Sequence, residues 1–415
     1  MSNTLPGQRN SIVPLSLMMF LQFFVWGAWY VSMTGFMGKH GMNGLIAAAY
    51  SVGPIAAIIS PFFLGLIADR FFATERVLAV MHVIGGALLM LAPSMARAYD
   101  PARDGSAFMQ PYILVLLGHM LCYMPTLGLT TSLSFHNLSN RERMFPLVRV
   151  WGTIGWIAGN WAVGFLPEGD KAAEQFYLAG GAGVVLGLFS FVLPHTPPMG
   201  AGRKPSVREI LGLDSLALLG RPSYAVFVVC SFLLCIPLAA YYAGARSFVD
   251  ACGVTVNGSA TTAMSFGQGA EIVFMVLMPL CFARLGVKWM LAVGMLAWVV
   301  RYGLFSMAWD ERTKWMVMGG ILLHGICYDF FFVTGMIYAD RAATPAIRGQ
   351  AQGFLVLVTQ GLGMLIGAQA FGWLSARYTR GAVVDWKMIW LAPCVFALVV
   401  LVVFVVGFRE RKADE

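Results

Sequence analysis

Charged residues are scarce in this sequence: Asp, Glu, Lys and Arg fill 12% of its 415 positions, about half the share that soluble domains carry. Hydrophobic residues fill 59% and the mean hydropathy is +0.73, which together exclude a water-soluble globule. The seven cysteines mostly lie in or beside apolar segments and show no paired CxxC spacing, so a zinc site of that type is excluded as well. We interpret these cysteines as small buried hydrophobic residues.

Sequence signatures of hydrolytic enzymes are also missing. No HExxH or GxSxG string occurs at a suitable depth in the apolar segments, so we expect neither an intramembrane enzyme nor a metal cofactor. The first ten residues form a short polar stretch that leads into an apolar run too long for a signal peptide, and we therefore expect no cleavable signal. A channel or a receptor is a third interpretation, which counterflow exchange in vesicles would separate from a transporter.

Apolar runs long enough to cross a membrane recur along the whole chain. A transmembrane helix needs about 20 apolar residues to cross a hydrocarbon core of about 30 Å. We therefore predict an all-α membrane protein that crosses the lipid bilayer twelve times. The predicted spans are residues 14–37, 44–68, 77–96, 111–135, 146–165, 174–193, 223–249, 262–283, 288–308, 315–338, 349–376 and 387–408.

The basic residues are distributed unevenly between the loops, which indicates the orientation. If the N-terminus and every second loop are cytoplasmic, sixteen Lys and Arg residues fall inside, nine fall outside and three fall within spans. Cytoplasmic loops of membrane proteins carry such an excess. We therefore expect a multi-pass protein of the cell inner membrane with both termini in the cytoplasm. No basic patch is left over to bind nucleic acid.

The longest polar connection divides the chain into two halves. We expect a six-helix bundle over residues 1–193, a cytoplasmic linker over 194–222 and a second six-helix bundle over 223–415. Two pseudo-symmetric bundles, with the loop Gly65-Leu-Ile-Ala-Asp69-Arg70 between spans two and three, resemble the major facilitator superfamily. The resemblance implies that Asp69 and Arg70 act in gating on the cytoplasmic side, where the acid can meet a neighbouring helix N-terminus.

A short string of residues repeats between the two halves. Span four contains His119-Met-Leu-Cys-Tyr123, and span ten contains His324-Gly-Ile-Cys-Tyr328. The two strings have the same spacing at equivalent positions of the two halves, which supports an internal repeat. Coincidence is the alternative, because the match covers only five residues.

Two carboxylates lie near the middle of predicted spans. Asp329 lies near the centre of span ten and Glu271 at the centre of span eight. A charged side chain at the bilayer centre costs about 2.5–3.5 kcal/mol on insertion scales, so a carboxylate that takes up and releases a proton suits this depth. We predict that Asp329 and Glu271 couple transport to protons. A static ion pair of either residue with Arg301 of span nine is the alternative.

Helical spacing places further polar residues beside these carboxylates. Residues three or four apart share a helix face, which pairs Gln268 with Glu271 and His324 with Tyr328. We expect both pairs to contact the substrate, with Asp329 at the edge of the cavity. The neighbouring Gly325 would leave room next to Asp329. For His324, a hydrogen bond to a facing helix is the alternative.

Aromatic residues form further groups in spans one, five and seven. Gln22, Trp26 and Trp29 form a stripe in span one, where stacking rings and an amide suit a flat ligand with polar edges. The alternative is simple helix packing. Tyr241 and Tyr242 follow Pro237 in span seven, where a helix can break around a site. The residues on one face of span five are Arg149, Thr153 and Trp156; for the arginine, snorkelling to the cytoplasmic surface is the alternative.

These segments resemble a narrower family, the bacterial nucleoside:proton symporters. The resemblance covers most of the chain and runs through FLQFFVWGAWY (20–30), CYMPTLGLTTSLSFHNL (122–138), RVWGTIGW (149–156), GLDSLALL (212–219), Gln268 with Glu271, and DFFFVTG (329–335) through ATPAIRGQAQG (343–353). In that family, nucleosides bind in the central cavity. The resemblance therefore implies that Asp329 acts in proton coupling and that the substrate site includes Arg149, Thr153, Trp156, Gln268 and Glu271.

Some positions depart from the pattern of the best-known members. Ala239 and Tyr242 stand where those members carry a glutamine and an asparagine, and His324 and Tyr328 replace a tyrosine and a phenylalanine. We expect proton-driven uptake of nucleosides by a monomer that needs no cofactor beyond the proton gradient. A proton-coupled carrier of sugars, of other ribosylated compounds or of another polar metabolite is the alternative, as is an exporter.

Overall fold

The protein is helical throughout the part of the chain that its computed structural model describes. These residues are 6–63, 72–100, 106–139, 141–198, 213–308, 313–344, 347–381 and 383–409. The β structure within them is one small antiparallel hairpin, in which β1 (Thr379–Arg380) pairs with β2 (Val383–Val384). The all-α prediction is therefore confirmed for the described residues.

The chain divides into two compact units. The first comprises Met1–Ser206 with Asn257–Thr261, and the second comprises Val207–Val256 with Thr262–Glu415. The short segment 257–261 belongs to the first unit because Ser259 Oγ and the Thr261 backbone N–H donate to the buried Asp170 carboxylate, at 2.6 and 3.1 Å. The middle of the predicted linker, residues 199–212, lies outside the described residues.

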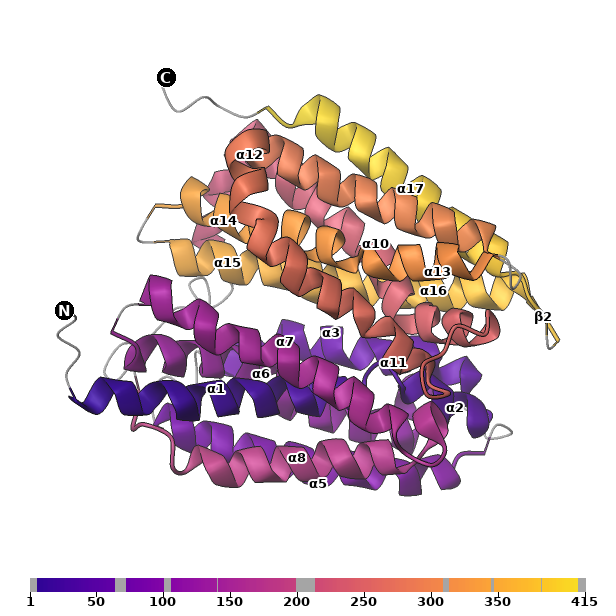
Figure 1. Cartoon of the computed structure of the whole chain (residues 1–415), viewed down its shortest axis with the longest axis horizontal. Coiled ribbons are helices and arrows are strands. Elements are labelled where there is room, and N and C mark those ends of the chain that lie inside the picture. Colours follow the sequence, from indigo (N-terminus) through magenta and orange to yellow (C-terminus); the bar gives the residue numbers. More distant parts are fainter. Residues whose placement is uncertain are drawn as a thin grey trace. The chain divides into compact units, whose positions relative to one another are not determined.

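The N-terminal half of the sequence forms long apolar helices joined by short connections. In Figure 1, α1 runs beside α7 and α5 runs beside α8, and these pairs also pack closely. The elements are α1 (Pro6–Gly27), α2 (Met33–Lys39), η1 (Asn43–Leu45), α3 (Ile46–Phe63), α5 (Thr74–Arg97), η3 (Ala107–Met109), α6 (Pro111–Asn137), α7 (Arg141–Gly164), η4 (Gly169–Lys171) and α8 (Glu174–Ser190).

The C-terminal half contains longer and more interrupted helices. In Figure 1, α12 and α17 lie side by side, and the two helices pack against each other. The elements are η5 (Leu213–Gly220), α10 (Pro222–Ala251), α11 (Ala260–Met264), α12 (Phe266–Met307), α13 (Lys314–Leu322), η7 (Ile326–Val333), α14 (Thr334–Ala342), α15 (Arg348–Val356), η8 (Leu357–Gly363), α16 (Met364–Tyr378) and α17 (Trp386–Gly407).

Each predicted span overlaps helical structure, and eight helical stretches among the described residues are long and apolar enough to cross a membrane. One of these stretches, 260–307, combines predicted spans eight and nine. They meet at Gly286, whose φ of 66° and ψ of −179° end one helix and begin the next. A glycine suits this turn because other residues rarely adopt a positive φ.

Four predicted spans differ in detail from the structure. The prediction of one helix over 14–37 is wrong, because the α-helix ends at Gly27 and residues 28–32 form turns before α2. Span seven does not break after Pro237, and α10 continues through it. Instead, spans ten and eleven contain the π-helical segments η7 and η8, a local geometry that often marks functional sites.

Candidate substrate and proton sites

A close contact between α1 and α7 positions the aromatic residues of the first unit. A Cβ atom at Gly155 would lie 2.1 Å from the Phe20 carbonyl oxygen, and one at Gly27 would lie 2.5 Å from the Trp156 carbonyl oxygen. Only glycine permits this approach of two backbones. As a result, the rings of Trp26 and Trp156 meet edge to face, with centroids 5.5 Å apart. The structure thus joins two residues that the sequence placed on separate spans.

A buried amide lies next to these rings. Gln22 is fully buried, its Nε2 donates to Thr126 Oγ1 at 2.8 Å, and its backbone carbonyl accepts from Tyr123 OH at 2.6 Å. Its Oε1 makes no hydrogen bond with a described residue, and the same is true of the indole N–H groups of Trp26 and Trp156. Unpaired buried polar atoms are costly, so this group has one acceptor and two donors to offer a ligand.

Trp29 does not continue the stripe of Gln22 and Trp26. It lies in the turn after α1 and is fully buried, with its ring 5.3 Å from His119 and 6.2 Å from Phe176. The prediction of a single stripe through Trp29 is therefore wrong, because the helix that would align these residues ends at Gly27. In this structure Trp29 packs between α6 and α8.

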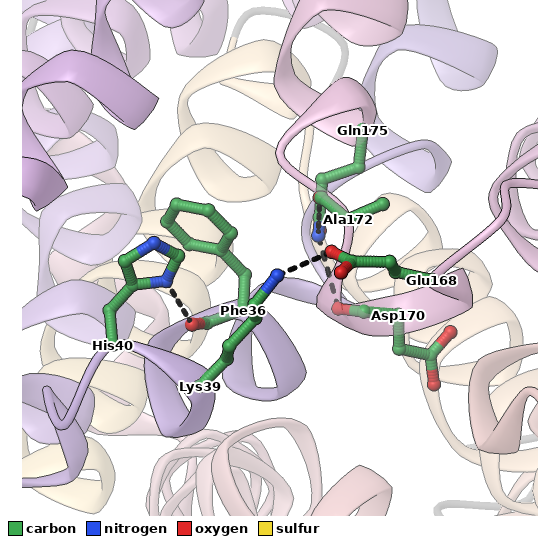
Figure 2. Close-up of polar contacts among 7 residues, drawn as sticks. All are labelled: Phe36, Lys39, His40, Glu168, Asp170, Ala172 and Gln175. Atoms are coloured by element: carbon green, nitrogen blue, oxygen red, sulfur yellow. Dashed lines mark hydrogen bonds and ion pairs between the residues drawn. The ribbon is translucent and has the colours of Figure 1, made fainter.

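A polar cluster holds the turn after α1 in place. Figure 2 shows Lys39 of α2 bonded to Glu168, and the Gln175 amide bonded to the backbone carbonyl of Asp170. The other side of the Gln175 amide, Oε1, accepts from Ser32 Oγ at 2.7 Å. Ser32 is the residue immediately before α2. The cluster therefore ties the interrupted first span to the connection between α7 and α8.

Arg149 lies inside the first unit against an aromatic ring. Its guanidinium carbon is 4.3 Å from the centre of the Phe23 ring, a cation–π contact. Gly152 makes this contact possible, since a Cβ there would lie 2.7 Å from both the Arg149 guanidinium and the Phe23 ring. Arg149 is half-buried and makes no ion pair with a described residue. Thr153, one turn further on, is buried.

The second unit contains a buried arginine at the centre of an aromatic cluster. Arg301 of α12 is fully buried, and its guanidinium carbon lies 3.7 Å from the centre of the Tyr241 ring. Its Nε donates to the Gly320 carbonyl at 2.9 Å and its Nη2 contacts His324 Nδ1 at 3.2 Å. The Tyr241 and His324 rings stack with centroids 5.8 Å apart. The structure therefore brings Tyr241 and His324 together. The sequence had paired His324 only with Tyr328.

Asp329 is fully buried in the π-helical segment η7. Neither of its carboxylate oxygens has a hydrogen-bond partner among the described residues. Glu271 lies close enough to interact with it electrostatically. Arg301 forms no ion pair with either acid in the structure. The alternative of a static pair with Arg301 is therefore wrong for this conformation.

Gly325 has a different role from the one predicted. A Cβ there would lie 2.7 Å from the backbone nitrogen of Glu271 and 2.7 Å from the carbonyl carbon of Ala270. The expectation that this glycine leaves room beside Asp329 is wrong, because the backbone of α12 fills that room. Gly325 instead lets α12 approach closely, which places Glu271 near the segment that carries Asp329.

The remaining predicted residues of the second unit differ in burial. Gln268, Tyr242 and Tyr328 are half-buried, whereas Glu271 is buried. The Tyr328 ring is 6.1 Å from the ring of His324. The predicted gating residues, Asp69 and Arg70, lie outside the described residues.

Sequence reasoning did not assign a site role to three residues that organise these sites. Tyr123 and Thr126 bind Gln22, and Arg301 binds His324. Tyr123 had a signal, since it closes the repeated string in span four, and Arg301 was visible as a charge within a span. Their partners were not visible, because each contact joins helices that are far apart in the sequence.

Comparisons with known proteins agree over almost the whole chain. The model of the family described as "Nucleoside H+ symporter" matches residues 10–413. Among curated proteins, the chain is 38% identical over 415 residues to the Escherichia coli protein named "Putative nucleoside transporter YegT", covering 96% of this chain and 94% of that protein. It is 29% identical to the Escherichia coli nucleoside permease NupG, with 97% of each chain covered.

The fold also matches solved transporter structures. The crystal structure of the nucleoside transporter NupG superposes with a TM-score of 0.84 at 28% identity, covering 97% of this chain and all of that one. A D-xylose–proton symporter, at 13% identity and a TM-score of 0.72, shares the fold. These matches confirm the predicted all-α membrane transporter fold, and the relatives are transporters, not enzymes.

Proposed function

The chain belongs to the nucleoside–proton symporter family, and from this membership we propose that it takes up nucleosides together with protons by alternating access. The protein is a multi-pass membrane transporter. The family model and two transporters of nucleosides match it nearly end to end. The remaining question is which residues of this chain carry the two cargoes.

The observation that carries the proposal is the state of Asp329. A fully buried carboxylate with no hydrogen-bond partner and no counter-ion among the described residues is costly as an anion but tolerable when protonated. A neutral nucleoside supplies no charge to compensate it. Asp329 is therefore the proton carrier in this proposal, and Glu271, which interacts with it, takes part in the same step.

The test is uptake of radiolabelled nucleosides into proteoliposomes that carry the purified protein. With an inward proton gradient, the wild type should accumulate the nucleoside. Asp329→Asn mimics the protonated state and cannot release the proton, so it should bind nucleoside and exchange it while losing gradient-driven accumulation. Binding is measured by thermal shift and exchange by counterflow on the same preparation.

A matched control makes the same substitution at a surface acid. Asp340 of α14 is half-exposed and lies 3.8 Å from Arg348, a weak surface pair. Asp340→Asn should leave accumulation unchanged. The proposal for Asp329 is contradicted if Asp329→Asn still accumulates nucleoside against its gradient with normal dependence on pH. In that event Glu271→Gln is the next variant to measure.

The first unit supports a flat, polar-edged substrate. The rings of Trp26 and Trp156 offer stacking surfaces and unpaired N–H groups, while Gln22 Oε1 offers an acceptor. A nucleobase combines a π face with donors and acceptors on its edge, so it suits this set. Arg149 and Thr153 lie on the same helix as Trp156 and complete the proposed contacts.

One departure from the family pattern bears on which nucleoside is carried. Ala239 is buried, and its Cβ lies only 2.7 Å from where a Cβ of Gly367 would stand. The position therefore faces α16 and has no room for a longer amide. Selectivity in this chain then rests on Tyr242, His324 and Tyr328 instead. A ribosylated compound other than the common nucleosides is the second candidate on this ground.

The orientation and assembly are also part of the proposal. The excess of basic residues in alternate loops supports an inner-membrane location with both termini in the cytoplasm. We expect a monomer, with nucleosides and protons as its cargoes, the lipid bilayer as its environment, no cofactor and no nucleic-acid partner.

A further inference from the structure

The cluster around Arg301 contains more hydrogen-bond donors than acceptors. Arg301 Nη1 is buried and has no hydrogen-bond partner among the described residues, and the same holds for Tyr241 OH. A guanidinium has five N–H donors and no acceptor. It is also fully buried here, and it pairs with no carboxylate of the described residues. Such a charge calls for electron-rich partners, and the Tyr241 ring and the Gly320 carbonyl supply two of them.

The contact between Arg301 and His324 fixes the tautomer of the histidine. Because Arg301 Nη2 can only donate, His324 Nδ1 must accept with its lone pair. An imidazolium has no lone pair to offer, so the bonded ring is neutral and carries its proton on Nε2. That nitrogen makes no hydrogen bond with a described residue. His324 is 3% exposed as a whole, and its Nε2, unlike the fully buried Tyr241 OH, keeps some accessible surface.

We propose that Arg301 is a positioning residue that holds His324 as an Nε2–H donor, and that His324 and Tyr241 form a donor-lined subsite for an acceptor atom of the ligand. The part of this proposal that concerns the ligand rests on the proposed function. The ligand atom is a carbonyl oxygen, a ring nitrogen or a hydroxyl oxygen, all of which nucleosides carry. A ligand that offers only a donor to the His324 Nε2–H is rejected, since two donor groups would face each other.

Several ionisable groups surround His324, on its own segment or on the elements packed against it. They are Arg301, Glu271, Tyr241, Tyr328 and Asp329. Among them, only Arg301 bonds the His324 ring. Which nitrogen of the His324 ring carries the proton therefore depends on the contact with Arg301, which a substitution can remove.

The first measurement is ¹⁵N NMR of the full-length protein, labelled at its histidine ring nitrogens and reconstituted in liposomes at neutral pH. The chain has six histidines, and His324→Gln identifies the signals of His324 by their loss. The wild type should show the Nε2–H tautomer at this residue. Finding the Nδ1–H tautomer in the wild type overturns the proposal without any variant at Arg301.

Two variants test the role of Arg301. Arg301→Met removes the donor with a side chain of similar length, and the tautomer of His324 should shift away from Nε2–H. Arg301→Lys keeps a donor and should preserve the wild-type pattern. A folded Arg301→Met protein with unchanged His324 signals overturns the proposal. So does an Arg301→Met variant that keeps the tautomer but loses proton-driven accumulation, because Arg301 would then serve Asp329.

The ligand part of the proposal is tested by measuring the binding of uridine and of analogues in which one acceptor at a time, on the base or the ribose, is replaced by hydrogen. One analogue should bind the wild type about tenfold more weakly, the cost of one unpaired buried donor. It should bind His324→Phe as well as uridine does. If every analogue loses the same affinity in both proteins, the subsite is absent. If no nucleoside binds at all, the proposed function fails, whereas the NMR result still decides the role of Arg301.

Discussion

The two copies of the repeated His-x-x-Cys-Tyr string have opposite hydrogen-bond polarity. In the first unit, His119 Nδ1 donates to the Gly85 carbonyl at 2.9 Å, which leaves Nε2 as an acceptor without a partner among the described residues. In the second unit, His324 Nδ1 accepts from Arg301, which leaves Nε2 as a donor. A shared sequence pattern therefore fixes the position of each ring but not its chemistry. The facing helix decides that.

The helices that carry the two strings also differ. Around Tyr123, α6 is a regular helix of 27 residues, with the rings of Trp26, His82 and His119 packed on that tyrosine. Around Tyr328 the chain is π-helical and carries Asp329. Around Tyr123 the first unit thus presents rings and amides, with the half-buried Arg149 on the neighbouring Phe23 ring. The second unit instead holds the fully buried Arg301 and Asp329. In our proposals both units therefore contact the nucleoside, and the second unit also carries the proton on Asp329.

We expect the largest loss of stability from substitutions at the glycines where two backbones approach closely. One such substitution in each unit tests whether both units depend equally on these contacts. Gly155→Ala in α7 and Gly325→Ala each place a Cβ within 2.1 and 2.7 Å of a facing backbone. Overpacking of this kind costs about 1–3 kcal/mol and sometimes more, and we expect Gly155→Ala to be the worse of the two. Unfolding in detergent, followed by intrinsic tryptophan fluorescence, measures both.

Gly269→Ala is the matched control in a helix. Nothing lies within 4 Å of a Cβ there, so the change should stabilise the protein by about 0.4–1 kcal/mol through the unfolded state. A Gly325→Ala protein as stable as this control would show that the helices of the second unit can move apart to accept a Cβ. The close backbone contact at Gly325 would then not be essential to the second unit.

The next largest effect concerns the amide of the first unit. Gln22→Leu keeps the volume but removes Oε1, the unpaired acceptor, together with the bond to Thr126 Oγ1. Thr126 retains its bond to the Tyr123 carbonyl, so we expect stability to change by less than about 1 kcal/mol. Nucleoside affinity should fall by about 1–2 kcal/mol if Oε1 binds the ligand. Isothermal titration and a thermal melt on one sample separate the two effects, and unchanged affinity would make Gln22 a purely structural residue.

Much of the fold was predictable because the membrane imposes a simple rule. Each span must be a run of about 20 apolar residues, and the predicted ranges 77–96 and 223–249 lie within α5 and α10. The breaks were not predictable from hydropathy. The turn at 28–32 is as apolar as the helix before it, and its bond from Ser32 to Gln175 joins residues 143 apart in sequence.

The sites were predictable as residues but not as contacts. Buried charges such as Asp329 and Arg301 stand out in apolar spans, and helical spacing correctly suggested that Trp26 lies on a face with Gln22. Whether Arg301 meets Asp329 or His324 depends on how α12 packs against η7. That packing follows from Gly325 and Gly294, whose missing side chains admit the facing backbone. A glycine in a span indicates a close approach but not its partner.

The smallest effect is expected for substitutions of His119, the first of the two repeated histidines. His119→Asn keeps an N–H near the Gly85 carbonyl, so its stability should lie close to that of the wild type. His119→Phe loses the bond and should cost about 0.5–1.5 kcal/mol, the net value of one hydrogen bond, because the Gly85 carbonyl keeps its bond within α5. Nucleoside affinity should change in neither variant, whereas His324→Phe should weaken it. Thermal melts and binding on the four proteins test this, and a loss of affinity in His119→Phe that equals the loss in His324→Phe would mean that both copies of the string contact the ligand.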